Sequence, residues 1–124
     1  MTSARPLRIL IVDDNVGLAE NIAEILEIDG YVTSVAASAE EALTKTAPPP
    51  PDVVVTDYRL PGISGATLVR RFQEMGLTVR AIVISAYTDE KTIEDARSAG
   101  AAFVAKPVDF QRLGQIITER GTTS

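Results

Sequence analysis

The stretch RILIVDD at residues 8–14 decides the fold, because an apolar run too short to span a membrane ends in two aspartates. Similar apolar runs recur at 52–56 (DVVVT), 79–85 (VRAIVIS) and 101–105 (AAFVA). Runs of this kind are typical of strands that are buried on both faces. A further segment, YVTSVA at 31–36, alternates more and is predicted as an edge strand. The sequence therefore predicts five strands.

Between these strands, apolar residues recur at the spacing of a helix. These positions include Leu18, Ile22, Ile25 and Leu26, then Ile93 and Ala96, then Phe110, Leu113, Ile116 and Ile117. Ser38 followed by Glu41 forms a capping box, and Asp109 stands at the expected N-cap of the last helix. Glycines just past three expected helix ends suit a left-handed backbone: Gly30, Gly76 and Gly100.

Strict alternation of strand and helix predicts an α/β fold with a five-stranded parallel sheet, right-handed crossovers and helices on both faces, which is a doubly wound (βα)5 domain. A chain of 124 residues fits one such domain, 1–124, with short flexible termini. The proline run at 48–51 is predicted as a stiff extended connection into the third strand. Its alternative role is as a ligand for a polyproline-binding partner.

The composition excludes several classes of function. With no cysteine and no histidine, the chain has no disulfide, no Cys nucleophile, no Ser-His-Asp triad, no His-ligated zinc and no phosphohistidine. The absence of cysteine fits a reducing compartment, so we expect a cytoplasmic chain. A net charge of −5 with scattered basic residues indicates no direct binding of nucleic acid, and the short N-terminal apolar run indicates neither a signal peptide nor a membrane anchor.

Polar residues end the apolar runs, at the sheet edge where open parallel sheets bind ligands. Asp13 and Asp14 end the first run, Asp57 the third and Ser85 the fourth, and the fifth leads into Lys106. Three carboxylates would repel one another there unless a divalent cation were bound. Oxygen ligands alone favour a hard ion, Mg²⁺ first and Mn²⁺ as a substitute. The alternative is that the first two aspartates merely cap a helix.

The same residues point to a reaction. An ionised carboxylate beside a metal can attack a phosphoryl group, which makes Asp57 the candidate nucleophile. Lys106 would pair with the phosphoryl oxygens, and Ser85, which has no histidine base, fits a hydrogen-bond donor to the same group. Ser85 could instead be a strand-end hydroxyl in a turn.

As a set, these residues and the segment FVAKP at 103–107 resemble the receiver domain of two-component response regulators over about residues 7–120. The resemblance implies the flavodoxin-like strand order 2-1-3-4-5. It implies that Asp57 accepts a phosphoryl group from a sensor histidine kinase or a histidine phosphotransfer protein. It also implies that Asp14 ligates Mg²⁺ directly, Asp13 through water, and Arg59 through its backbone carbonyl. Lys106 would contact the phosphoryl group and form a cis bond to Pro107.

By the same resemblance, phosphorylation moves Ser85 toward the phosphoryl group and turns Phe103 inward, although Phe103 could equally be an ordinary core aromatic. The switch would change the surface of the fourth helix, fifth strand and fifth helix, roughly residues 89–120. This surface would contact an output domain or partner protein or form a homodimer.

Pro61, Gly62 and Gly65 match the family's loop after the phosphoacceptor residue. The bulky Arg59 and Tyr87 side chains are expected to slow hydrolysis of the phosphoryl group.

Three alternatives share the fold or the chemistry. A flavin carrier needs a phosphate-cradling loop after the first strand, where Asp13 and Asp14 would repel phosphate. An aspartyl phosphatase places its nucleophile and acid two residues apart after that strand, a pattern that Asp13 and Asn15 match poorly. The remaining alternative is a phosphorylation-independent protein-interaction domain. The resemblance favours a signalling domain over an enzyme.

Overall fold

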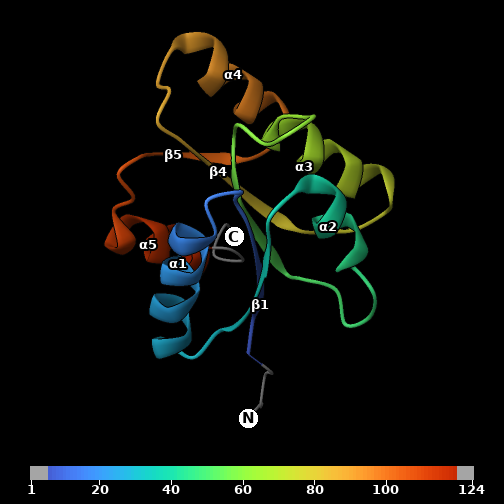
Figure 1. Ribbon diagram of the computed structural model, residues 1–124, viewed down its shortest axis with the longest axis vertical. Helices are drawn as coiled ribbons and strands as arrows, with labels where there is room; N and C mark the ends of the chain where they lie inside the picture. The colour runs from blue at the N-terminus through green and yellow to red at the C-terminus, as the bar shows by residue number, and fades with distance from the viewer. Residues whose placement is uncertain (1–5, 120–124) are drawn as a thin grey trace.

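Five strands form one fully parallel sheet in the order β2-β1-β3-β4-β5, as the resemblance implied. The structure, a computed structural model, describes residues 6–119 (Figure 1). The strands are β1 (Arg8–Val12), β2 (Val32–Ala36), β3 (Val53–Asp57), β4 (Arg80–Ser85) and β5 (Ala102–Ala105). They match the predicted strands to within one residue, and Asp57 is the last residue of β3. The expected flexible ends lie outside the described residues.

Five helices cover the two faces of the sheet. They are α1 (Val16–Ile28), α2 (Ala39–Thr44), α3 (Gly65–Glu74), α4 (Glu90–Ser98) and α5 (Phe110–Glu119). Helices α1 and α5 pack on one face, and α2, α3 and α4 lie on the other (Figure 1). The predicted doubly wound fold is therefore confirmed.

Alternate residues of the central strands supply the two halves of the core. In β1, Ile9 and Ile11 pack toward α1 and α5, whereas Leu10 and Val12 pack toward the α2–α4 side. All four side chains are at most 1% exposed. Because successive side chains of a strand point to opposite faces, a sheet covered on both sides requires an unbroken apolar run.

The predicted helix ends are confirmed. The Ser38 side chain accepts a hydrogen bond from the Glu41 N–H, although the Glu41 carboxylate reaches back to the N–H of Ala37, one residue earlier than a capping box requires. Asp109 accepts from the N–H groups of Gln111 and Arg112. The three glycines past helix ends have left-handed φ angles: Gly30 (97°), Gly76 (83°) and Gly100 (83°).

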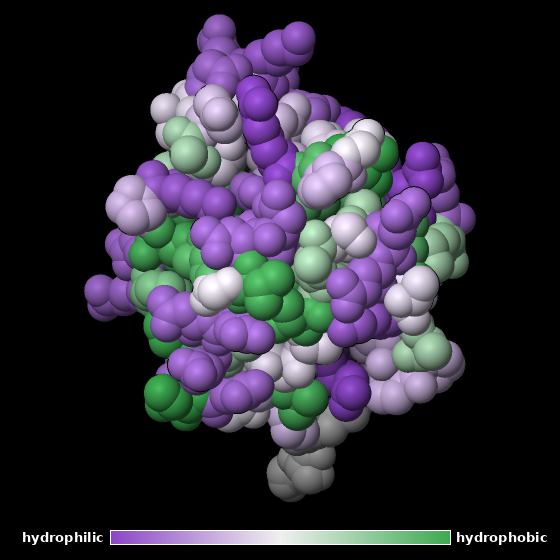
Figure 2. Space-filling view, viewed as in Figure 1, coloured by the Kyte–Doolittle hydropathy of each residue, from purple (hydrophilic) through white to green (hydrophobic). Residues whose placement is uncertain are grey.

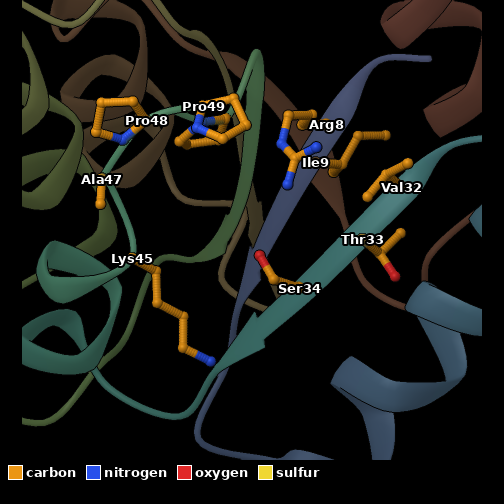
Figure 3. Close-up of a pocket in the computed structure, with 10 residues that line it drawn as sticks. Arg8, Ile9, Val32, Thr33, Ser34, Lys45, Ala47, Pro48 and Pro49 are labelled. Atoms are coloured by element: carbon orange, nitrogen blue, oxygen red, sulfur yellow. The ribbon is translucent and has the colours of Figure 1, made fainter. Parts of the chain in front are cut away.

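The proline run differs from its prediction. Residues 47–49 bend, the Pro48–Pro49 bond is cis, and Pro51 is buried, so the connection is not a straight extended segment. These prolines form one wall of a groove of about 400 Å³ that also contains Arg8, Ser34 and Lys45 (Figure 3). Arg8 is the first residue of β1, so this groove lies toward the opposite end of the sheet from Asp13 and Asp57.

The surface carries apolar residues only in small patches between polar ones on the face that Figure 2 shows. Within residues 6–119, no helix combines the length and the apolar character that crossing a membrane requires.

Gly65 is fixed by close packing at the start of α3. Its N–H donates to the Tyr58 carbonyl at 2.6 Å, and a Cβ atom at this position would lie 2.3 Å from the backbone oxygen of Asp57. No side chain fits there unless the end of β3 moves.

We therefore expect Gly65→Ala to lower the free energy of unfolding by about 1–3 kcal/mol, the usual range for overpacking. Denaturant unfolding measures this change. Gly114→Ala is the matched control, since a Cβ there meets nothing within 4 Å in α5. That variant should be neutral or more stable by about 0.5–1 kcal/mol. Equal effects of the two substitutions would contradict the close approach at Gly65.

Candidate functional site

The carboxyl ends of the strands bring the predicted acidic residues together. Asp13 follows β1, Asp14 is its neighbour, and Asp57 ends β3, which pairs directly with β1. One carboxylate oxygen from each of the three lies within 4.8 Å of the others. The predicted cluster is therefore present.

Asp13 and Asp14 are not the caps of α1. The N-cap is Asn15, whose side chain accepts from the Leu18 N–H at 3.1 Å. Asp13 is 3% exposed and accepts from the Asn15 N–H at 2.9 Å, whereas Asp14 is exposed. The alternative of two simple helix caps is wrong, so both carboxylates are available to the site.

Lys106 supplies the positive charge. Its Nζ lies 3.4 Å from Asp13 Oδ2 and 3.4 Å from Asp57 Oδ1, and its side chain is 23% exposed. The Lys106 N–H donates to the Ser85 carbonyl at 2.9 Å, which fixes its backbone beside β4. The Lys106–Pro107 bond is cis, as the resemblance implied.

One ammonium group does not balance three carboxylates. Burial raises the pKa of Asp57, the charge of Asp13 raises it further, and Lys106 opposes both effects. A raised carboxyl pKa means that the surroundings disfavour the negative charge. A cation at this point would relieve that repulsion, and because the donors are all carboxylate oxygens, the cluster fits a hard divalent ion such as Mg²⁺.

Ser85 ends β4 and Phe103 lies in β5, and among the described residues no hydrogen bond joins either side chain to Asp57. Ser85 is 1% exposed, and its Oγ accepts from the Tyr87 N–H at 2.9 Å. This is the turn arrangement that the sequence left open for Ser85. Phe103 is partly buried against the core on the α2–α4 side. The switching roles of both residues remain predictions.

Two contacts beside the cluster were not predicted. The Arg59 guanidinium carbon lies 4.2 Å from the centre of the Tyr87 ring, which is a cation–π distance. The Tyr58 hydroxyl donates to Asp95 Oδ2 of α4 at 2.7 Å. Both pairs are far apart in sequence, and no local pattern signals either of them. The role of the Arg59 carbonyl remains a prediction.

A sequence model of the response regulator receiver domain matches residues 9–118. The chain belongs to the response regulator receiver family. Sporulation initiation phosphotransferase F of Bacillus subtilis is 32% identical over 107 residues, which cover 86% of each chain. A response regulator receiver protein of Anaeromyxobacter is 38% identical over 107 residues and is longer, so that the match covers 86% of this chain and 45% of that protein.

A solved structure agrees with this assignment. The CheX-CheY-BeF₃-Mg²⁺ complex from Borrelia burgdorferi contains a chain that is 30% identical and superposes with a TM-score of 0.82, covering 93% of this chain and 89% of that one. Receiver domains are signalling domains that interact with kinases and output partners. The family and the fold expected from the sequence are confirmed.

The raised pKa of Asp57 predicts a pH-dependent gain of stability in Asp57→Asn. A group whose pKa is higher in the folded than in the unfolded state costs stability once it ionises. Without metal, Asp57→Asn should therefore be more stable than the parent at pH 7. The difference should shrink as pH falls and vanish below the ordinary carboxyl pKa, where both forms are neutral.

Denaturant unfolding between pH 3 and pH 8 in a chelating buffer measures this profile. Exposed Glu24, changed to Gln, is the control and should alter the profile little. A loss of stability in Asp57→Asn at neutral pH would show that repulsion does not dominate the cluster.

Proposed function

We propose that this chain acts as a single phosphoacceptor receiver domain, with Asp57 taking a phosphoryl group from the phosphohistidine of a sensor histidine kinase or a histidine phosphotransfer protein. The observation that carries the proposal is the setting of Asp57. Its carboxylate ends a buried strand, lies beside Asp13 and Asp14, and has the Lys106 ammonium 3.4 Å away. The partner must supply the histidine, because this chain has none.

The transfer forms one bond and breaks another. A carboxylate oxygen of Asp57 bonds to phosphorus as the bond from phosphorus to the partner's imidazole nitrogen breaks, and that nitrogen leaves with its electron pair. Lys106 keeps its proton throughout and offers its ammonium N–H groups to the phosphoryl oxygens. The product stays on Asp57, so the chain is a substrate and signal carrier and not an enzyme with turnover.

The acidic cluster would hold the metal ion. The carboxylates of Asp13, Asp14 and Asp57 lie close enough together to hold one ion. We assign Asp14, Asp57 and the backbone carbonyl of Arg59 as direct ligands of Mg²⁺ and Asp13 as a ligand through water, with Mn²⁺ able to substitute. A bound divalent cation supplies neutralisation of the negative charge that gathers as phosphoryl and carboxylate groups approach. The solved complex that contains a chain of similar fold also contains BeF₃ and Mg²⁺, which agrees with a magnesium requirement.

The phosphorylated state would signal through the face that contains α4, β5 and α5. Ser85 would donate to the phosphoryl group, Phe103 would turn inward, and the altered face would bind an output domain or partner protein or a second copy of the chain. A cytoplasmic location and the absence of nucleic-acid binding stay predictions from the sequence.

The decisive experiment is an intact-mass measurement with Mg²⁺ and a small acyl-phosphate donor. We expect the parent chain to gain one phosphoryl group, because Asp57 is the nucleophile in the cluster. The gain should be absent from Asp57→Asn and from a sample treated with a chelator. Glu24→Gln, on the exposed face of α1, should gain the group like the parent.

The opposite outcome favours the alternative function. Folded protein that binds Mg²⁺ but gains no phosphoryl group from either a small donor or a phosphohistidine partner would contradict the proposal. The chain would then act as a phosphorylation-independent protein-interaction domain of the same fold.

The Arg59–Tyr87 pair predicts a long-lived phosphoryl group. It joins the loops that follow β3 and β4, close to Asp57, and Arg59 is itself exposed. We expect the double variant Arg59→Ala, Tyr87→Ala to lose phosphate several-fold faster than the parent, since water would reach phosphorus more freely. The decay of the phosphorylated mass after removal of the donor measures the rate, and an unchanged rate would reject this role.

A further inference from the structure

Four side chains join α4 to α3 and to the residue that follows Asp57. Tyr58, Arg70, Asp95 and Ser98 form this group, which we call the Asp95 cluster. The Tyr58 hydroxyl donates to Asp95 Oδ2 at 2.7 Å. The Arg70 guanidinium donates to Asp95 Oδ1 at 2.8 Å, to the Asp95 carbonyl at 3.2 Å and to the Ser98 hydroxyl at 2.7 Å. The two carboxylate oxygens of Asp95 therefore bind two separate parts of the chain, the residue after β3 and helix α3.

These polar bonds matter because α4 has few apolar anchors. Its buried residues are Thr92 and Ala96, both small, whereas α3 buries Leu68, Val69 and Phe72. A helix that buries so little apolar surface gains little from the hydrophobic effect. Hydrogen bonds to charged groups are stronger than neutral ones, and those of Arg70 and Tyr58 hold the pKa of Asp95 below its ordinary value.

The Asp95 cluster is linked to the acidic site in two ways, through Tyr58 and through the loop between β4 and α4. Tyr58 follows Asp57 directly, and its N–H donates to the Ile84 carbonyl of β4. Ser85 begins the loop to α4, and Asp89 caps α4 by accepting from the Thr92 N–H and hydroxyl. Because Ser85 Oγ accepts from the Tyr87 N–H, a movement of Ser85 toward a phosphoryl group on Asp57 would draw the loop before α4 with it. A displacement of this loop would move the N-terminus of α4, the helix that carries Asp95.

We infer that the Asp95 cluster is a latch that holds α4 in its resting position and opposes capture of the phosphoryl group at Asp57. The inference rests on the proposed function. Hydrogen bonds of 2.7–2.8 Å weaken steeply when their partners separate or tilt, so a small shift of α4 releases Asp95. Tyr58, Arg70 and Asp95 are thus positioning residues. Part of the free energy gained when the phosphoryl group is captured would be used to break the latch, so the strength of the latch sets the equilibrium between the resting and the shifted position of α4.

Tyr58→Phe tests the latch, because it keeps the ring and removes only the hydroxyl. The probe is BeF₃⁻ with Mg²⁺, and the readouts are its dissociation constant and the amide spectrum of α4. If the bond exists only in the resting state, its loss should tighten BeF₃⁻ binding about threefold to tenfold. The amide signals of the free variant should move toward the BeF₃⁻-bound positions. The affinity for Mg²⁺ alone should stay unchanged, which a general loosening of the fold does not predict.

Tyr31→Phe is the matched control. Tyr31 packs on the opposite face of the sheet, against the core beneath α1 and α5, and this substitution should leave BeF₃⁻ affinity unchanged. Arg70→Gln is the second variant, since it weakens the same cluster from α3 and should also tighten BeF₃⁻ binding. Because both substitutions release the same latch, the double variant should tighten BeF₃⁻ binding by less than the two single effects combined.

The outcomes separate the latch from the proposed function. Tight binding of BeF₃⁻ by the parent with unchanged or weaker binding by both variants overturns the latch and leaves the phosphoacceptor function standing. A parent chain that binds Mg²⁺ but no BeF₃⁻ and accepts no phosphoryl group overturns both.

Discussion

The repulsion among Asp13, Asp14 and Asp57 is the constraint on which the rest of this structure depends. Three carboxylates within 4.8 Å, one of them almost fully buried, destabilise the fold in the absence of a cation. The sheet maintains this arrangement because β1 and β3 are neighbours whose buried apolar residues fix their register. Lys106 offsets only part of the repulsion, so the remaining negative charge favours binding of a cation.

The backbone around Asp57 is closely packed. Gly65 approaches the Asp57 carbonyl where any side chain would collide, and the Tyr58 N–H is bound to β4. The start of α3 is therefore packed directly against the end of β3. Under the proposed function, a carboxylate held in this way would need little reorganisation when a phosphoryl donor docks, which is the usual advantage of a preorganised site.

The strands and the acidic residues were predictable because their signals are local. An apolar run followed by aspartate marks a buried strand with a polar end, and the topology of parallel sheets then gathers such ends at one edge. The strand order came from the family resemblance, since no local pattern encodes which strands pair. The Tyr58–Asp95 bond and the Arg59–Tyr87 contact depend on the packing of distant segments. The bend in the proline run was missed because composition alone predicted extension.

The contrast between α4 and the other long helices bears on how a receiver domain can move. Helices α1 and α5 bury leucine and isoleucine, so displacing either would expose core surface. Helix α4 buries only Thr92 and Ala96, and polar contacts also join it to α3: those of Asp95 and Ser98 with Arg70, and the Ala99 carbonyl, which accepts from the Gln73 side chain at 2.9 Å. Polar contacts of this kind can exchange for water when they break, whereas apolar contacts cannot. Under the proposed function, a shift of α4 driven by charge at Asp57 would disturb few apolar contacts, chiefly those of Ala96, whereas a shift of α1 or α5 would expose leucine and isoleucine.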